Sequence, residues 1–99
     1  MNSEAQLYVI AESLEGPIKI GRSVSAKTRL ASLQTGNPRS LLLVGFVTMP
    51  ADDVIKAEQW LHEELSQFAL VGEWFDISVQ FIQSYLPDFF LTHGLGVLR

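Results

Sequence analysis

The spacing of hydrophobic residues changes along the chain, and each spacing predicts a type of element. Near the N-terminus, segment 7–11 is rich in aromatic and β-branched residues, and in segment 18–22 Ile18 and Ile20 alternate with Lys19. This alternation at every second position is typical of a half-buried strand. A Gly-Pro pair, which is a strong turn signal, precedes the second segment. The two segments therefore predict a β-hairpin with a rather long loop.

A helical spacing follows the hairpin. Ala26, Leu30 and Leu33 share one face of a helix, because residues three and four positions apart lie on the same side. Ser23 or Ser25 is suited to cap the start of this helix, and a glycine lies where the helix is expected to end.

The middle of the chain predicts a buried strand and then the longest helix. The nearly continuous apolar run at 41–49 is typical of a central strand covered on both faces, and Pro50 ends it. The segment 51–68 predicts the helix, with Asp52 or Asp53 as its cap. Its core-facing stripe consists of Val54, Ala57, Leu61, Leu65 and Phe68.

The last third of the chain predicts a short extended piece and a final helix. The extended piece lies at 71–78, and the helix begins after Ser78 and ends at Pro87. The order β-β-α-β-α-α predicts one α/β domain of the α+β type, a compact sandwich whose small, mainly antiparallel sheet is flanked by helices. We expect residues 1–85 to form this domain and 86–99 to be an apolar tail of the same unit, either a strand or a cover for a partner.

The composition fits one packed domain and excludes several classes of protein. The chain has 99 residues, 47% apolar and 18% charged, which favours a single folded core over disorder. It contains no cysteine, so a disulfide scaffold, a thiolate metal site and a cysteine nucleophile are excluded. We see no signal peptide and no run of the roughly 20 apolar residues that a membrane helix needs. We therefore expect a cytoplasmic protein that does not enter membranes.

Charge is distributed unevenly along the chain. The net charge of −4 weighs against a nucleic-acid binder. However, most of the basic residues lie between positions 19 and 39, a window without Asp or Glu, so the local field can be positive. We predict nucleic-acid contacts from Arg22, Lys27 and Arg39, while an ordinary solvated basic face is the alternative.

Several short blocks occur in an order that is typical of a known family. The blocks are LYVI at 7–10, KIGRS at 19–23, RLASLQTGNP at 29–38, EQWLHEEL at 58–65 and GEWF at 72–75. Together they resemble the GIY-YIG endonuclease superfamily, and more closely its small phage-type branch, from Leu7 to Ile77.

The resemblance implies a divalent-metal-dependent DNA endonuclease. Tyr8 falls on the tyrosine of the first half of the signature, Lys19 stands where the second half has a tyrosine, and Gly21 matches its last glycine. Arg29 falls on the arginine that contacts the scissile phosphate. Glu58 falls on the glutamate that binds one Mg²⁺ or Mn²⁺ ion.

The same branch also has features at His62, Glu73 and Trp74, and we include His62 as a supporting residue. Glu58 and His62 lie one helical turn apart, which suits either a metal or an ordinary surface pair.

This set of residues is chemically sufficient for phosphodiester hydrolysis with one metal ion. A carboxylate holds the ion, which acts as a Lewis acid on the leaving oxygen, and an arginine binds the phosphate with two hydrogen bonds. Tyr8 can orient or deprotonate water if a cation lowers its pKa, and we expect Lys19, on the paired strand, to be that cation. Taken singly, each residue is also explained as a core tyrosine or as a surface charge.

Two other functions compete with cleavage. A catalytically silent nucleic-acid-binding module on the same fold would use the same basic window. A protein-interaction domain would explain the acidic total and the apolar tail. Because the chain offers few phosphate contacts, we expect DNA binding to involve a homodimer, a larger protein partner or little sequence specificity.

Overall fold

The computed structural model describes residues 3–95, and it confirms the predicted class and order of elements. The sheet is antiparallel, with strand order β3-β1-β2-β4. Its strands are β1 (Glu4–Ala11), β2 (Ile18–Ser23), β3 (Leu42–Pro50) and β4 (Trp74–Phe75). The helices are α1 (Ala26–Thr35), α2 (Ala51–Glu64), the short 3₁₀ helix η1 (Ser66–Phe68) and α3 (Val79–Thr92).

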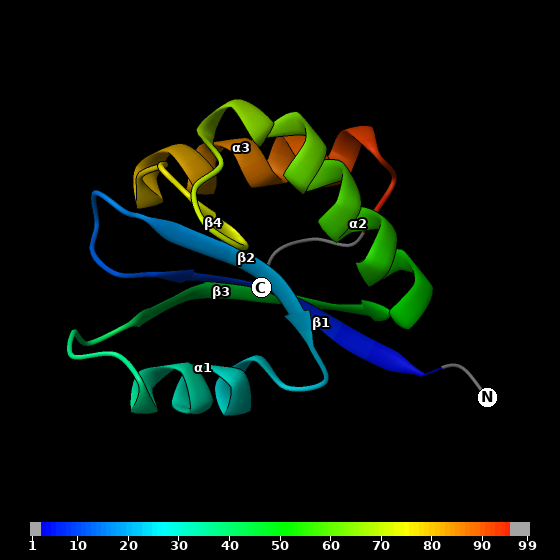
Figure 1. Ribbon diagram of the computed structural model, residues 1–99. Helices are drawn as coiled ribbons and strands as arrows, with labels where there is room; N and C mark the ends of the chain where they lie inside the picture. The colour runs from blue at the N-terminus through cyan, green and yellow to red at the C-terminus, as the bar shows by residue number, and fades with distance from the viewer. Residues whose placement is uncertain (1–2, 96–99) are drawn as a thin grey trace.

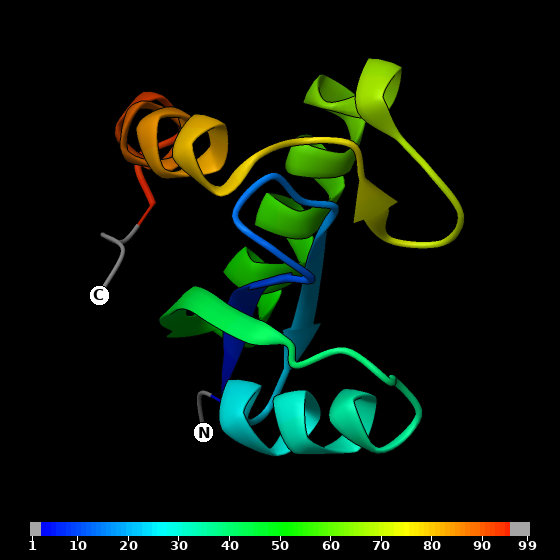
Figure 2. The same ribbon diagram turned by 90° about the vertical axis from the view of Figure 1, so that its left-hand side faces the viewer.

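The helices form two layers around the sheet. Figure 1 shows α1 on one face and α2 with α3 on the other, and Figure 2 shows the same layers after a quarter turn. Leu7 and Val9 of β1 belong to the larger core under α2 and α3, whereas Tyr8 and Ile10 belong to the smaller core under α1. The alternation of side chains along β1 thus supplies both cores.

The strand β3 lies at the edge of the sheet, so the prediction that it is central was wrong. Among the described residues it pairs with β1 alone. The predicted cover on both faces is nevertheless present, and it accounts for the apolar run. Val47 and Met49 join the core under α2 and α3, while Leu43 and Phe46 pack against the core under α1.

Two of the predicted helix caps are confirmed and one is not. Ser25 and Ser78 each accept a hydrogen bond from the backbone N–H three residues later, at the starts of α1 and α3. The cap position of α2 is Pro50, without a side-chain hydrogen bond. Asp52 and Asp53 lie instead inside the first turn, where their charge complements the helix dipole.

Pro87 does not end the last helix, which is a further correction. The helix α3 continues through Pro87 to Thr92. Phe89 and Phe90 are only 4% and 2% exposed, so the last turn of α3 is anchored in the core. Packing of these rings stabilises the helix beyond a residue that usually stops one.

Polar contacts fasten the middle of α3 and the residue after its end to α2. Glu64 at the end of α2 accepts a hydrogen bond from Tyr85, and His93 Nε2 lies 2.9 Å from Glu64 Oε2. The described part of the predicted tail is therefore the end of α3 and a turn to Leu95, whereas 96–99 lie outside the described residues. Among the helices of residues 3–95, none is long and apolar enough to cross a bilayer.

Candidate functional site

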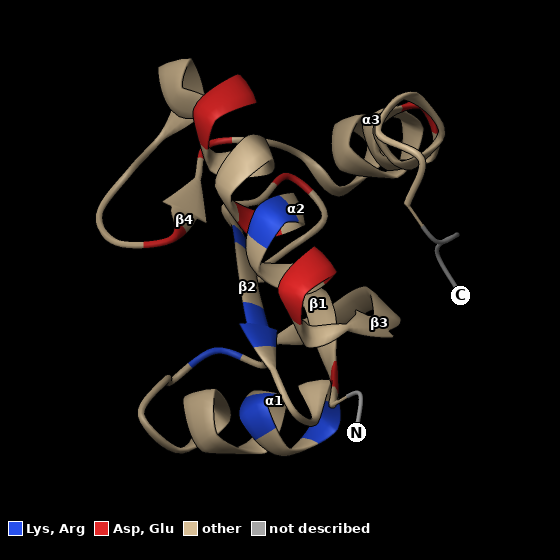
Figure 3. Ribbon diagram, turned by 90° about the vertical axis from the view of Figure 1, so that its right-hand side faces the viewer, with Lys and Arg blue, Asp and Glu red and all other residues tan. Residues whose placement is uncertain are grey.

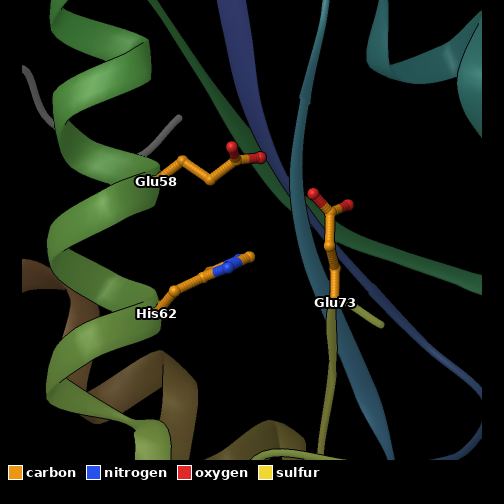
Figure 4. Close-up of side chains that lie close together, drawn as sticks. All are labelled: Glu58, His62 and Glu73. Carbon is orange, nitrogen blue, oxygen red and sulfur yellow. The ribbon is translucent and has the colours of Figure 1, made fainter. Parts of the chain in front are cut away.

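The candidate site lies on β2 just beyond the short strand β4. Because β4 pairs with β2 only at Ile18 and Lys19, the next residues of β2 have no partner strand on that side among residues 3–95. Side chains from other elements gather there. Figure 4 shows Glu58 and His62 projecting from α2 toward Glu73, which comes from the segment before β4.

Gly21 makes room for Tyr8 at this edge. The two residues are partners in the ladder between β1 and β2, and Tyr8 is fully buried. A Cβ atom at Gly21 would lie 2.5 Å from the Tyr8 hydroxyl oxygen and 3.0 Å from Glu73 Oε1. Gly21 is therefore required for space, and the phenol crosses it to end beside Glu73. Among the described residues, the Tyr8 hydroxyl has no hydrogen-bond partner.

The backbone of Ile20 positions two of the polar residues. Its N–H donates to the backbone carbonyl of Glu73 at 3.2 Å, and its carbonyl accepts from His62 Nε2 at 2.9 Å. Since a carbonyl only accepts, Nε2 of His62 carries a proton, and the neutral ring keeps a lone pair on Nδ1. One carboxylate oxygen from each of Glu58 and Glu73 and a ring nitrogen of His62 lie within 4.8 Å of one another.

Each carboxylate is also paired with a cation. Lys19 Nζ lies 3.4 Å from Glu73 Oε1, and Arg22 Nε lies 3.4 Å from Glu58 Oε1. The other oxygen of Glu58, Oε2, is buried and has no hydrogen-bond partner within residues 3–95. The cluster therefore keeps one carboxylate oxygen available to a further cation or proton.

The surroundings of Tyr8 disfavour the phenolate. Burial raises the pKa of the Tyr8 hydroxyl, and the negative charges of Glu73 and Glu58 raise it further, against the opposing effect of Arg29. The expectation that Lys19 lowers this pKa was wrong. Lys19 pairs with Glu73, so its charge is directed to that carboxylate.

The surroundings of Glu58 likewise disfavour its ionised form. Burial raises the pKa of the Glu58 carboxyl and nearby Glu73 raises it further, while His62 and Arg22 oppose the shift. Two carboxylates this close repel each other unless a proton or a cation lies between them.

A family model described as the T5orf172 domain matches residues 5–88. The chain belongs to this family. The T5orf172 domain is phage-associated and related to nuclease-like folds, and it is compatible with a nuclease-like or DNA-binding module. The match includes every residue of the cluster. No curated protein and no solved structure matches the chain.

The other predicted basic residues of this T5orf172 domain lie farther along the same side. Lys27 and Arg29 are exposed on α1, and Arg29 is close enough to act on the pKa of Tyr8. Arg39, in the loop after α1, lies 3.8 Å from Glu12, so part of its charge is offset. Figure 3 shows the Lys and Arg segments on β2, on α1 and on that loop, all within the stretch from 19 to 39 that contains no Asp or Glu of its own.

Sequence reasoning assigned no role to Glu73, although the structure places it at the centre of the cluster. It was noted as a feature of the phage-type branch, but nothing local distinguishes its carboxylate from an ordinary surface one. Its neighbour Trp74 places a ring 5.7 Å from Lys19 Nζ, so both residues of the block contact the same lysine. The available signals were its place in the branch and a carboxylate directly before the aromatic pair of a short strand.

Proposed function

We propose that this T5orf172 domain is a GIY-YIG-type DNA endonuclease, which hydrolyses phosphodiester bonds with the help of one Mg²⁺ or Mn²⁺ ion. One observation carries the proposal. Tyr8, Lys19 and Glu58, from three different elements, meet Glu73 at the same edge of β2, beside the basic side chains of Arg22 and Arg29.

The residues present fit a divalent ion. Glu58 Oε2 is buried and unpartnered among the described residues, and the neighbouring Glu73 raises the cost of its charge. A cation would relieve both effects, and Glu58 would hold it. When bound, such an ion supplies a Lewis acid for the leaving oxygen.

The chain's own residues bind and orient the reactants. Because its pKa is raised, the Tyr8 hydroxyl is neutral at pH 7. It is buried beside Glu73, so it would donate a hydrogen bond to the attacking water or to a phosphate oxygen once Glu73 moves aside. Neutralising Glu73 and Glu58 would remove two of the influences that raise this pKa, which would make the Tyr8 hydroxyl easier to deprotonate. Lys19 and Arg29 supply positive charge for the phosphate.

The first test is cleavage of supercoiled plasmid by purified protein with Mg²⁺ or Mn²⁺. We expect nicked or linear product, and we expect Glu58→Ala to slow its formation about 100-fold or more, because losing the Lewis acid removes several kcal/mol of transition-state stabilisation. Glu63→Ala is the matched control, since Glu63 is exposed on the same helix, and it should leave the rate unchanged. Cleavage that persists at the full rate in Glu58→Ala would contradict the proposal.

A catalytically silent DNA-binding module is the second candidate. The observation that favours it is the pairing of Glu73 with Lys19 and of Glu58 with Arg22, because these cations already offset each carboxylate without a metal. Salt-sensitive DNA binding without cleavage in either metal would support this candidate. A protein-interaction domain would show neither activity. Cytoplasmic location and a dimeric state stay predictions from the sequence.

A further inference from the structure

We propose that Glu58, His62 and Glu73 together form a three-ligand site that binds a first-row transition metal ion such as Mn²⁺ in preference to Mg²⁺. This inference rests on the proposed function for the place of the ion. It adds His62 and Glu73 as ligands, whereas the proposed function needs only Glu58 to hold the ion.

The geometry suits a single ion. The candidate ligand atoms lie within 4.8 Å of one another. Ligands of one octahedral ion at about 2.1 Å lie roughly 3–4 Å apart, so only a small inward movement is needed. Glu73 can supply that movement, because its side chain is 40% exposed and comes from the segment before β4 (Figure 4).

His62 is held as a metal-ligating histidine usually is. Its Nε2–H donates to the carbonyl of Ile20, which fixes the ring and leaves the Nδ1 lone pair for a ligand. The ring of Phe75, whose centroid is 5.1 Å from that of His62, packs edge-on against the imidazole and restricts its rotation further.

Buried polar groups at the cluster point independently to a ligand. The Tyr8 side chain is 0% exposed, ends beside Glu73 and has no hydrogen-bond partner in residues 3–95. The Oε2 atom of Glu58 is also buried and has no hydrogen-bond partner among these residues. Buried groups of this kind normally have partners. A hydrated cation between Glu58 and Glu73 would give Oε2 a direct partner and would place water near the Tyr8 hydroxyl.

The nitrogen ligand determines the preference among metals. Mg²⁺ selects oxygen ligands and keeps much of its hydration shell, whereas imidazole suits transition metals, whose affinities rise along the first row. A site with two carboxylates and one imidazole should therefore favour Mn²⁺ and its heavier neighbours. Lys19 and Arg22 each pair with one Oε1 atom, so Oε2 of Glu58 stays available.

The test measures metal binding without cleavage. Mn²⁺ is titrated into metal-free protein and followed by electron paramagnetic resonance, and Mg²⁺ affinity is obtained by competition. We expect one Mn²⁺ per chain. His62→Gln and Glu73→Gln should each lower the Mn²⁺ affinity about tenfold or more, because losing a direct ligand should cost at least as much as losing a residue that only supports a ligand. For His62→Gln the Mg²⁺ affinity should fall less, so the preference for Mn²⁺ declines.

The variants keep the fold and isolate the ligands. Gln at position 62 can still donate to the Ile20 carbonyl, and Glu73→Gln alters a partly exposed side chain whose backbone bond stays. Glu63→Gln is the control and should bind as wild type. Circular dichroism melts in chelator check that each variant is folded. Mn²⁺ affinity that is unchanged in both His62→Gln and Glu73→Gln would overturn the inference.

This outcome is separable from that of the proposed function. Ligand-dependent Mn²⁺ binding without DNA cleavage would support the site and overturn the nuclease. Cleavage that requires Glu58, together with Mn²⁺ binding that is insensitive to His62→Gln and Glu73→Gln, would support the nuclease and overturn the three-ligand site.

Discussion

At the scale of single residues, the backbone of Ile20 and the missing side chain of Gly21 organise the site. Ile20 bonds both the Glu73 carbonyl and the His62 ring, and Gly21 leaves the space through which Tyr8 reaches the edge of β2. The polar side chains thus converge through contacts with one short piece of strand. The cost is a buried carboxylate oxygen on Glu58 that has no hydrogen-bond partner in the described part of the chain.

That cost predicts that Glu58→Gln stabilises the metal-free protein. Gln has nearly the same shape as Glu and carries no charge, so it removes the disfavoured ionised form. Its amide N–H can donate a hydrogen bond to Glu73. The ion pair with Arg22 is lost, but Arg22 is half-exposed, so this pair contributes little to stability. We expect a gain of about 1 kcal/mol, equivalent to roughly 4–8 °C in the melting temperature of a domain this small. Calorimetry in chelator at neutral pH measures it.

With added Mn²⁺, wild type should become more stable than Glu58→Gln. An ion that binds only the folded wild type raises its melting temperature by mass action. Glu63→Gln, at an exposed position of α2, should match wild type under both conditions. A Glu58→Gln protein that is less stable than wild type in chelator would show that the charge is well compensated without metal.

At the scale of elements, the last turn of α3 belongs to the core of the domain. Phe90 is 2% exposed, while its neighbour Leu91 is 81% exposed, so adjacent residues of one helix face opposite environments. The contacts of Glu64 with Tyr85 and His93 add a polar link to α2 at the same place.

Neighbouring alanine substitutions should therefore differ strongly in their effect on unfolding. We expect Phe90→Ala to lower the free energy of unfolding by about 3–5 kcal/mol through loss of burial and formation of a cavity. Leu91→Ala should change it by less than about 0.5 kcal/mol. Urea denaturation of both variants measures the difference. Similar losses would mean that Leu91 is covered in solution.

At the scale of the whole molecule, the net charge of −4 conceals a basic region. The window from 19 to 39 carries Lys and Arg without Asp or Glu, and the structure places it on β2, α1 and the loop after α1 (Figure 3). Glutamates outside this window pair with Lys19, Arg22 and Arg39, so contacts with phosphates should come mainly from Lys27 and Arg29 on α1, for which no ion pair occurs within residues 3–95.

Binding to a short DNA duplex should therefore depend on salt through this side alone. We expect Arg29→Ala to weaken binding and to reduce the slope of log affinity against log salt concentration by about 1, the effect of losing one phosphate contact. Fluorescence anisotropy across a salt series measures the slope. Lys56→Ala, at an exposed lysine of α2, is the control and should leave the slope unchanged. Equal effects of the two substitutions would indicate non-specific attraction.

The sequence by itself determined the local structure and the candidate chemistry. The alternation around Lys19 predicted the hairpin, Ser25 and Ser78 predicted the starts of two helices, and the order of elements predicted the class of fold. These signals are local, because caps and periodicity act between residues a few positions apart. The choice of Tyr8, Lys19, Arg29 and Glu58 came from the order of short blocks.

Only the tertiary structure decided which residues meet. It placed β3 at an edge, carried α3 past Pro87 and brought Glu73 to Glu58 and His62. It also directed Lys19 to Glu73 and left the pKa of Tyr8 raised. Strand order, burial and the convergence of charges depend on packing between segments far apart in the chain, where local spacing carries no information.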